Sequence, residues 1–126
     1  MDPRHRRGRI GEEIGAEYLR DRGWAIEARN WRAGHSEIDL VARRGDTVAF
    51  VEVKTRGSPG CGHPLEWVTA RKRREVEAAA RAWLRTRGRE LGGGFTVRFD
   101  AVAVEVRAGR APRIRYVEDA WRVGDG

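Results

Sequence analysis

The chain has 126 residues, five tryptophans, a formal net charge of +7 and a single cysteine. This length predicts one domain, over residues 1–126, with its own hydrophobic core. No apolar run approaches the ~20 residues that cross a bilayer, and no apolar segment follows the basic amino terminus as in a signal peptide. One cysteine excludes an internal disulfide and fits a reducing compartment. We therefore expect a cytoplasmic protein that is neither embedded in a membrane nor stabilised by disulfides.

The positive charge favours a polyanionic partner. The sequence pI is about 10.8, which by charge alone suits DNA, RNA or an anionic membrane surface. Of the 26 basic residues only Lys54 and Lys72 are lysines. Arginine and lysine are nearly interchangeable on a solvated surface, so the positions that keep lysine are candidates for sites that need a compact ammonium group.

The first predicted element is a helix over residues 10–22, preceded by a basic arm at residues 1–9 that we expect to be mobile. Apolar residues recur in this segment at helical spacing, and Gly23 is a natural stop. Two glycines four residues apart indicate that the helix approaches another element closely. Glu12 lies beside the buried face and can lean toward a site, whereas Glu13 points to water.

Five strands and a second helix follow along the chain. Apolar runs and alternation predict the strands, and Thr69 is a good N-cap for the helix. The strands are expected at residues 24–32, 37–42, 47–55, 96–106 and 113–117, and the helix at residues 69–87. A loop is expected at residues 57–62, a turn at Pro64, and a closing turn after Glu118 with Trp121 packed inward. The order α-β-β-β-α-β-β predicts an α/β fold, with a mixed five-stranded sheet flanked by helices.

The hairpin formed by the second and third strands sets the register of several charged side chains. A two-residue loop that pairs Arg43 with Asp46 places Glu37 opposite Glu52. By the same register, Asp39 is expected opposite Phe50. A slip of one residue would move every side chain to the other face.

Side chains along a strand alternate with a period of two, so one face carries several charges. The residues expected on that face are Glu37, Asp39, Glu52 and Lys54. Three carboxylates and one ammonium group are costly on a half-buried face unless they are paired or bind a metal. A solvated hairpin would alternate in the same way, but the apolar continuation of this face through Phe50 favours a pocket at a sheet edge.

Oxygen ligands without histidine or cysteine select Mg²⁺ or Mn²⁺ over zinc. An ion held by Asp39 and Glu52 would bind a phosphate oxygen and help to ionise a water molecule. Lys54 could position that water or neutralise charge in the transition state. The set of Cys61 and two histidines is too sparse for structural zinc.

The sequence resembles a known family through the segments GHSEIDLV at residues 34–41 and VAFVEVKTR at residues 48–56. Both look like the core of the YraN-like family of bacterial proteins, which belongs to the restriction-endonuclease-like superfamily and is similar to archaeal Holliday-junction resolvases. The match extends over nearly the whole chain. Ser36 and Gly15 depart from the residues usual in the family.

The resemblance implies a restriction-endonuclease-like fold and roles for individual residues. Asp39 and Glu52 correspond to metal ligands, Lys54 to the catalytic lysine, and Glu12 to a helix-borne carboxylate near the metal. Glu37, which the register argument adds to the same face, is a further candidate metal ligand. Resolvase-like enzymes act as dimers, so a homodimer is one possible oligomeric state of this chain. No nucleotide cofactor is expected.

Other charged residues have two interpretations. Contacts to nucleic acid are predicted for Arg32, Arg56, Arg71, Lys72 and Arg73. Lys72 could equally be a lysine whose stem packs at the edge of the core. Asp100 could be a site carboxylate, but a structural ion pair with Arg98 is favoured.

The sequence therefore predicts a Mg²⁺- or Mn²⁺-dependent endonuclease that hydrolyses phosphodiester bonds in DNA, especially structured or branched DNA. A catalytically silent nucleic-acid-binding module of a DNA repair or uptake complex is the alternative. RNA is also a possible substrate, because no motif in the sequence indicates recognition or exclusion of a 2′-hydroxyl group.

Overall fold

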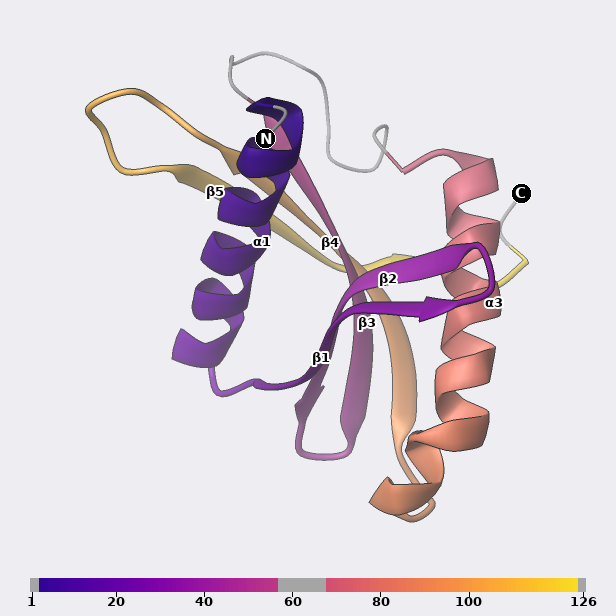
Figure 1. Ribbon diagram of the computed structural model, residues 1–126. Helices are drawn as coiled ribbons and strands as arrows, with labels where there is room; N and C mark the ends of the chain where they lie inside the picture. The colour runs from indigo at the N-terminus through magenta and orange to yellow at the C-terminus, as the bar shows by residue number, and fades with distance from the viewer. Residues whose placement is uncertain (1–2, 57–67, 125–126) are drawn as a thin grey trace.

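The computed structural model describes residues 3–56 and 68–124, with side chains described from residue 8 onward. Two α-helices, α1 (Pro3–Asp21) and α3 (Ala70–Thr86), lie on opposite faces of one sheet (Figure 1). The strands are β1 (Ala25–Ala33), β2 (Ser36–Arg44), β3 (Thr47–Arg56), β4 (Thr96–Glu105) and β5 (Arg113–Trp121), and a 3₁₀ helix, η1, covers Gly88–Leu91. The predicted α/β class and the mixed five-stranded sheet with a helix on each face are confirmed.

The sheet has the strand order β1-β2-β3-β4-β5. The pair β3 and β4 is parallel, and the other pairs are antiparallel. A parallel pair requires a crossover between its strands, and α3 lies in that connection. Residues 48–53 of β3 are all buried, as expected for a central strand covered on both faces.

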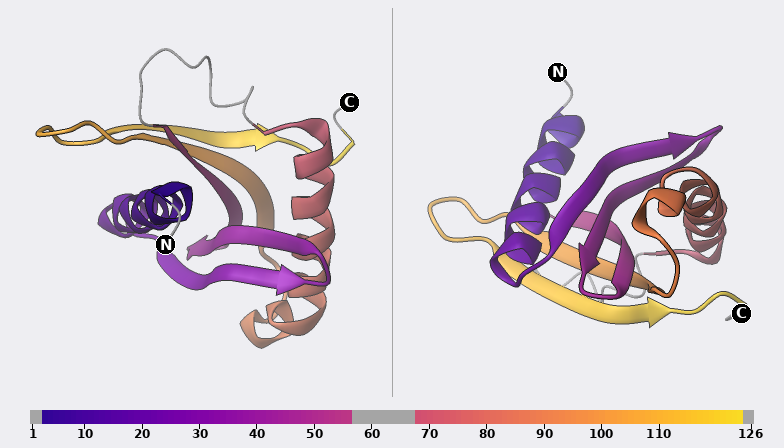
Figure 2. Two further views of the ribbon diagram at one scale, coloured as in Figure 1. Left: turned by 45° about the horizontal axis from the view of Figure 1, so that its top comes forward. Right: turned by 90° about the horizontal axis from the view of Figure 1, so that it is seen from below.

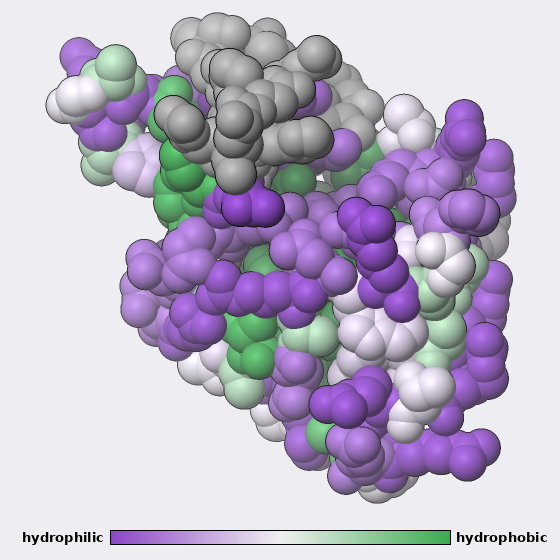
Figure 3. All heavy atoms as spheres, viewed as in Figure 1, coloured by the Kyte–Doolittle hydropathy of each residue, from purple (hydrophilic) through white to green (hydrophobic). Residues whose placement is uncertain are grey.

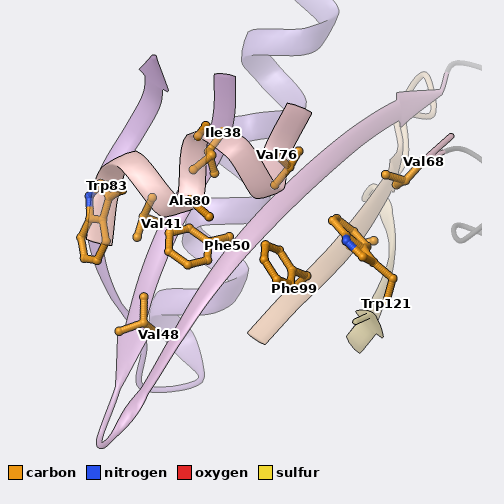
Figure 4. Packing of buried hydrophobic residues seen from close by; sticks show 12 residues of the cluster. Ile38, Val41, Val48, Phe50, Val68, Val76, Ala80, Trp83, Phe99 and Trp121 are labelled. Carbon is orange, nitrogen blue, oxygen red and sulfur yellow. The ribbon is translucent and has the colours of Figure 1, made fainter. Parts of the chain in front are cut away.

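Two apolar clusters hold the helices to the sheet. On the α3 side, Phe50 of β3 meets Trp83 of α3 edge to face, with ring centroids 5.7 Å apart (Figure 4). On the α1 side, Leu19 and Val51 belong to a second buried cluster. Alternate residues of the same strands supply the two clusters, which is why the strands that contribute to both are apolar on both faces.

The second helix forms as its sequence predicts. The Thr69 side chain accepts a hydrogen bond of 3.2 Å from the Lys72 backbone N–H, which confirms Thr69 as the N-cap. The helical spacing predicts a buried stripe of Val76, Ala79, Ala80, Trp83 and Leu84. The first four are buried, and Leu84 is partly buried against the same cluster.

Helix α1 starts earlier than predicted. The first helical residue is Pro3, so residues 3–9, expected to be an arm, form the first turns of the helix. Proline fits the first helical position because its missing N–H has no helical partner there, and arginine has good helix propensity. At the far end the helix stops before Gly23, whose φ is +90°, as predicted.

The carboxyl-terminal end also differs from the prediction. Instead of a turn after Glu118, β5 continues to Trp121, and an irregularity in its pairing with β4 accommodates a left-handed φ of +51° at Asp119. Trp121 is buried, as expected. The loop predicted at residues 57–62 and the turn at Pro64 lie outside the described residues.

The register of the β2–β3 hairpin corrects the prediction by two residues. Arg44 pairs with Thr47, so the loop consists of Gly45 and Asp46. Gly45 has a φ of +58°, the left-handed conformation that a type II′ turn requires at its first central residue. A shift of two preserves which face each side chain occupies, but Phe50 lies opposite Val41 and not opposite Asp39.

Hydrophilic side chains dominate the face of the molecule shown in Figure 3, where α3 and the β1–β2 hairpin lie. Within the described parts of the chain, no helix combines the length and apolar character needed to cross a membrane.

Candidate functional site

The β2–β3 ladder opens at Asp39, and this opening creates the site. The last paired residues are Leu40 and Val51. Beyond them, the Asp39 carboxylate takes the place of a ladder partner, because its Oδ2 accepts a hydrogen bond of 2.8 Å from the Val53 backbone N–H. Extending the observed register would set Asp39 against Glu52. Asp39 thus turns toward β3 at the point where the regular pairing of β2 and β3 ends.

Glu52 is the most unusual residue of the core. Only 1% of its surface is exposed, and its Oε1 has no hydrogen-bond partner. Its Oε2 lies 3.8 Å from Nζ of Lys72 on α3. Burying a carboxylate oxygen without a partner costs free energy, so such an atom in a folded protein calls for a functional explanation.

The electrostatics of the pair follow from this burial. Burial raises the pKa of the Glu52 carboxyl well above its usual value, and the negative charge of Asp39 raises it further. Burial also raises the pKa of Asp39, which the Val53 N–H and the charge of Lys72 partly offset. Two carboxylates held close together in a dry environment need positive charge beside them.

The positive charges of both lysines of the chain lower the pKa values of Asp39 and Glu52. Lys54 follows Glu52 by two residues on β3, and Lys72 lies in the first turn of α3. The charge of each favours the ionised forms of Asp39 and Glu52. Two elements that are distant in the sequence therefore bring the two lysines to one place.

Helix α1 brings a further carboxylate toward the site by approaching β3 closely. A Cβ atom on Gly11 would lie 1.9 Å from Oγ1 of Thr55, and one on Gly15 would lie 3.4 Å from Cγ2 of Val53. The close approach expected from the two glycines is thus confirmed. It sets Glu12 where burial, and next the charge of Asp39, raise the pKa of its carboxyl.

The neighbouring glutamates behave differently. Glu13 lies at the surface, as predicted, and forms an ion pair with Arg29. Glu37 is half-buried and lies 3.2 Å from Nη2 of Arg32. Its negative charge raises the pKa of Asp39, so it borders the site, but its carboxylate pairs with an arginine.

The acidic pair suits a hard divalent cation. Among the described residues, no three His, Cys, Asp or Glu side chains converge on one point. Mg²⁺ commonly uses only one or two carboxylates and fills its remaining positions with water and substrate phosphate. The unpaired Oε1 of Glu52 next to Asp39 provides the kind of ligand atoms that such an ion takes. The two residues therefore fit Mg²⁺ or Mn²⁺, whereas Glu37 is not gathered into a third ligand.

The candidate phosphate-binding arginines are spread around this centre. Arg71 and Arg32 are highly exposed, with 85% and 74% of their side-chain surface accessible. Arg56 is half-buried at the end of β3. Arg73 instead packs inward, where its Nε donates a hydrogen bond of 3.0 Å to the Val68 carbonyl. Its guanidinium group also lies 5.7 Å from the centroid of the Trp121 ring on β5, so Arg73 contributes to the α3–sheet contact.

Asp100 belongs to a separate network. Its carboxylate is fully buried and receives two hydrogen bonds of 2.9 Å from the guanidinium group of Arg98. The Tyr116 hydroxyl and the Asp119 backbone N–H also donate to it. Every acceptor is used, which supports the structural interpretation of Asp100.

One residue at the site was missed by the sequence analysis. The side chain of Asn30 on β1 lies near Glu12 and lowers the pKa of its carboxyl, against the raising effect of burial and of Asp39. Asn30 has a φ of +48° within a strand. Asparagine tolerates this conformation better than most residues, but the strand pattern alone gives no sign of it.

Fold and site together define an α/β protein in which β2 and β3 bring a half-buried aspartate, Asp39, beside the buried Glu52, with two lysines close to the pair. The model of the family described as "Uncharacterised protein family UPF0102" matches residues 11–104. The chain belongs to the UPF0102 family, which confirms the resemblance to YraN-like proteins.

Several UPF0102 proteins resemble the chain over almost their whole length. The Rhodococcus jostii protein is 45% identical over 114 residues, which cover 90% of this chain and 94% of the relative. The Acidothermus cellulolyticus protein is 46% identical over 121 residues, covering 90% and 92%. The Chlorobaculum tepidum protein is 40% identical over 123 residues, covering 94% and 93%.

Proposed function

We propose that the chain is a Mg²⁺- or Mn²⁺-dependent endonuclease of the restriction-endonuclease-like superfamily that hydrolyses phosphodiester bonds in DNA. The observation that carries the proposal is Glu52, a carboxylate with 1% exposure and an unpaired Oε1, set beside Asp39. A purely structural acidic residue would satisfy both oxygens, as Asp100 does.

Each residue of the site has a distinct part in this proposal. Asp39 and Glu52 hold the cation, and the hydrogen bond from the Val53 N–H fixes the orientation of Asp39. When bound, the cation polarises a phosphate oxygen and lowers the pKa of a water molecule. Lys54 orients the attacking water and stabilises negative charge on the phosphate. Lys72 neutralises Glu52 and contacts a phosphate of the substrate.

The charge of the protein supports a nucleic-acid substrate. The net charge of +7 attracts a phosphate backbone over a distance set by the ionic strength. Arg32 and Arg71 expose most of their side chains, so both are available to contact phosphates. Structured or branched DNA is proposed over RNA because of the resemblance to Holliday-junction resolvases.

A cleavage screen tests the proposal. Wild-type protein should cut at least one of single-stranded, duplex, flap or four-way-junction DNA in the presence of Mg²⁺ or Mn²⁺, and RNA is included as an arm. Glu52→Gln and Lys54→Ala should each reduce cleavage at least about 100-fold, the loss typical of a removed transition-state contact. Glu90→Gln is the matched control, because Glu90 is an exposed glutamate on η1. Equal cleavage by wild type and Glu52→Gln would contradict the proposal.

The alternative is a nucleic-acid-binding module that does not cut. It is favoured by the finding that no three ligand side chains converge within the described ranges. Such a module would bind DNA with an affinity that depends on salt but not on Mn²⁺ or on Glu52. Wild-type protein that binds the four-way junction tightly and cleaves nothing would support this alternative.

A further inference from the structure

The end of the β4–β5 hairpin carries a dense run of positive charge. Residues 105–115 contain four arginines and one glutamate. The loop at residues 106–112 joins β4 to β5, and Figures 1 and 2 show it projecting beyond the other strands of the sheet. Residues 108–113 are all exposed. Residues 105–115 are called the arginine hairpin below.

The arginine hairpin leaves the sheet at the end that carries the candidate site. Because β3 and β4 are parallel, their carboxyl ends lie at the same edge, where the Val106 backbone N–H donates a hydrogen bond of 2.9 Å to the Arg56 carbonyl. Lys54 of β3 lies beside Ala103 of β4, which pairs with Arg115 of β5. One strand therefore separates Lys54 from Arg115, and the usual spacing of strands sets their backbones about 10 Å apart.

The two faces of the arginine hairpin differ in character. On one face, Ile114 is partly buried against the apolar cluster on the α1 side. Arg113 and Arg115 flank Ile114, so both point to the other face of the sheet. Val53 of β3 also belongs to the α1-side cluster, so its neighbour Lys54 points to that same other face. The arginines and the lysine of the candidate site thus share one face of the sheet.

The tip of the hairpin is ordered from within. Nε and Nη2 of Arg107 donate hydrogen bonds of 3.1 and 2.7 Å to the Ala111 carbonyl. The Arg110 backbone N–H donates one of 3.3 Å to the Arg107 carbonyl. Within the described ranges, Arg110 and Arg113 form no ion pair, although Glu105 lies opposite Arg113 in the ladder. A preformed loop with positive charge that is not neutralised attracts anions.

A nucleic-acid backbone suits this surface better than a membrane does. Guanidinium groups bind phosphate oxygens through paired N–H donors. Arg113 and Arg115 lie roughly 7 Å apart along β5, and Arg110 lies further out, so the arginines form a row that leads away from Lys54. Each DNA strand presents a phosphate about every 3.4 Å along the helix axis. A membrane surface would instead require exposed apolar side chains beside the charges, whereas the apolar face of the hairpin packs against the protein.

We propose that the arginine hairpin is a further DNA-binding surface, which holds the phosphate backbone on one side of the cut through Arg110, Arg113 and Arg115. This inference rests on the proposed nuclease function for the identity of the substrate. The three arginines act in binding and do not touch the reacting atoms. Arg107 closes the loop that presents them.

A binding titration tests the proposal. Fluorescence anisotropy is measured on a labelled DNA duplex and a labelled four-way junction, without divalent cations, for wild type and for Arg110→Gln/Arg113→Gln. Each phosphate contact contributes about 0.9 to the slope of log K against log salt concentration. The double variant should therefore lower that slope by about 1.8 and weaken binding about 10-fold or more at physiological salt.

Arg81→Gln/Arg85→Gln is the matched control, because it removes the same charge from exposed positions on α3. The control should leave the slope unchanged. Arg110→Lys/Arg113→Lys keeps the charge and should restore most of the slope. Equal losses in the glutamine variants of the hairpin and of α3 would overturn the inference. Wild-type binding to phosphatidylserine vesicles that depends on the hairpin, without hairpin-dependent binding to DNA, would also overturn it.

Cleavage kinetics provide the second readout. On the DNA that wild type cuts, Arg110→Gln/Arg113→Gln should raise KM about 10-fold and leave kcat unchanged, because a contact made equally before and in the transition state affects binding alone. An unchanged KM would overturn the inference. Wild-type protein that binds DNA through the hairpin but cuts nothing with Mg²⁺ or Mn²⁺ would overturn the proposed function alone. An active nuclease whose salt slope does not change in the hairpin variant would overturn the role of the hairpin alone.

Discussion

Nζ of Lys72 lies 3.8 Å from Oε2 of Glu52, so one of the two lysines in the chain faces a carboxylate buried in the core. The ammonium group comes from the first turn of α3 and the carboxylate from β3. This contact ties the helix to the acidic pair. It also offsets part of the cost of burying Glu52.

Replacing Lys72 with methionine should destabilise the protein at neutral pH. Removing one partner of a fully buried ion pair costs about 3–5 kcal/mol. We expect a smaller loss of about 1–3 kcal/mol, because Lys72 is partly exposed and Lys54 remains near Glu52. Urea denaturation measures the change. Lys72→Arg keeps the charge and should lose less than half as much, and equal losses in the two variants would show that the charge is not responsible.

The stability of the metal-free protein should fall as the pH rises. The pKa values of Asp39 and Glu52 are raised in the folded state, so the folded protein binds more protons than the unfolded chain between the two sets of pKa values. Their contribution to stability is greatest below about pH 4, the unfolded pKa, and is lost as the pH rises through the folded values. Urea midpoints across this range measure the slope.

Glu52→Gln provides the control for this pH dependence. Glutamine cannot ionise, so the variant should show a shallower fall and should be more stable than wild type at neutral pH. A pH dependence identical to that of wild type would mean that Glu52 does not titrate as its burial indicates.

Gly11→Ala should separate α1 from β3. The new Cβ would lie 1.9 Å from Oγ1 of Thr55, so the helix or the strand has to move, with an expected cost of about 1–3 kcal/mol. Gly8→Ala is the matched control on the same helix, because a Cβ there meets nothing within 4 Å and alanine favours the helix. The double variant Gly11→Ala/Thr55→Ala should recover part of the loss. A fully neutral Gly11→Ala would contradict the close approach.

Arg98→Met tests whether Asp100 contributes to stability and not to metal binding. It leaves the fully buried Asp100 without its bidentate partner, which should cost about 3–5 kcal/mol. Urea denaturation measures this loss. At a temperature where the variant stays folded, its Mn²⁺ binding should equal that of wild type, because Asp100 is not part of the proposed metal site. A large loss of Mn²⁺ affinity would assign Asp100 to the site.

Much of the fold follows from local patterns in the sequence. The helical stripe of α3 and its N-cap at Thr69 depend on residues close in the chain, and both are as predicted. The face shared by Glu52 and Phe50 follows from the period of a strand. A register wrong by two residues leaves that face unchanged on β3. On β2, however, Ile38 and Val41 both pack on the α3 side although they are three residues apart, so the regular alternation that put Glu37 and Asp39 on one face does not hold.

Other features depend on contacts between distant segments. The early start of α1 at Pro3 and the continuation of β5 to Trp121 could not be read from periodicity alone. The Lys72–Glu52 contact requires the crossover between β3 and β4 to place α3 over the end of β3. The left-handed φ of Asn30 lies in the part of the β1–β2 hairpin where Ile38 and Val41 pack on the same side, and a single asparagine in a strand does not predict it.

Calorimetric titration with Mn²⁺ tests the central claim most directly, since it reports on Asp39 and Glu52 without requiring the right DNA substrate. Wild-type protein should bind Mn²⁺, and Glu52→Gln should weaken that binding by at least about 100-fold, the upper end of the loss seen when only outer-shell residues are changed. Glu90→Gln should bind as wild type does. Binding of equal strength by wild type and Glu52→Gln would contradict a metal site at the buried carboxylate.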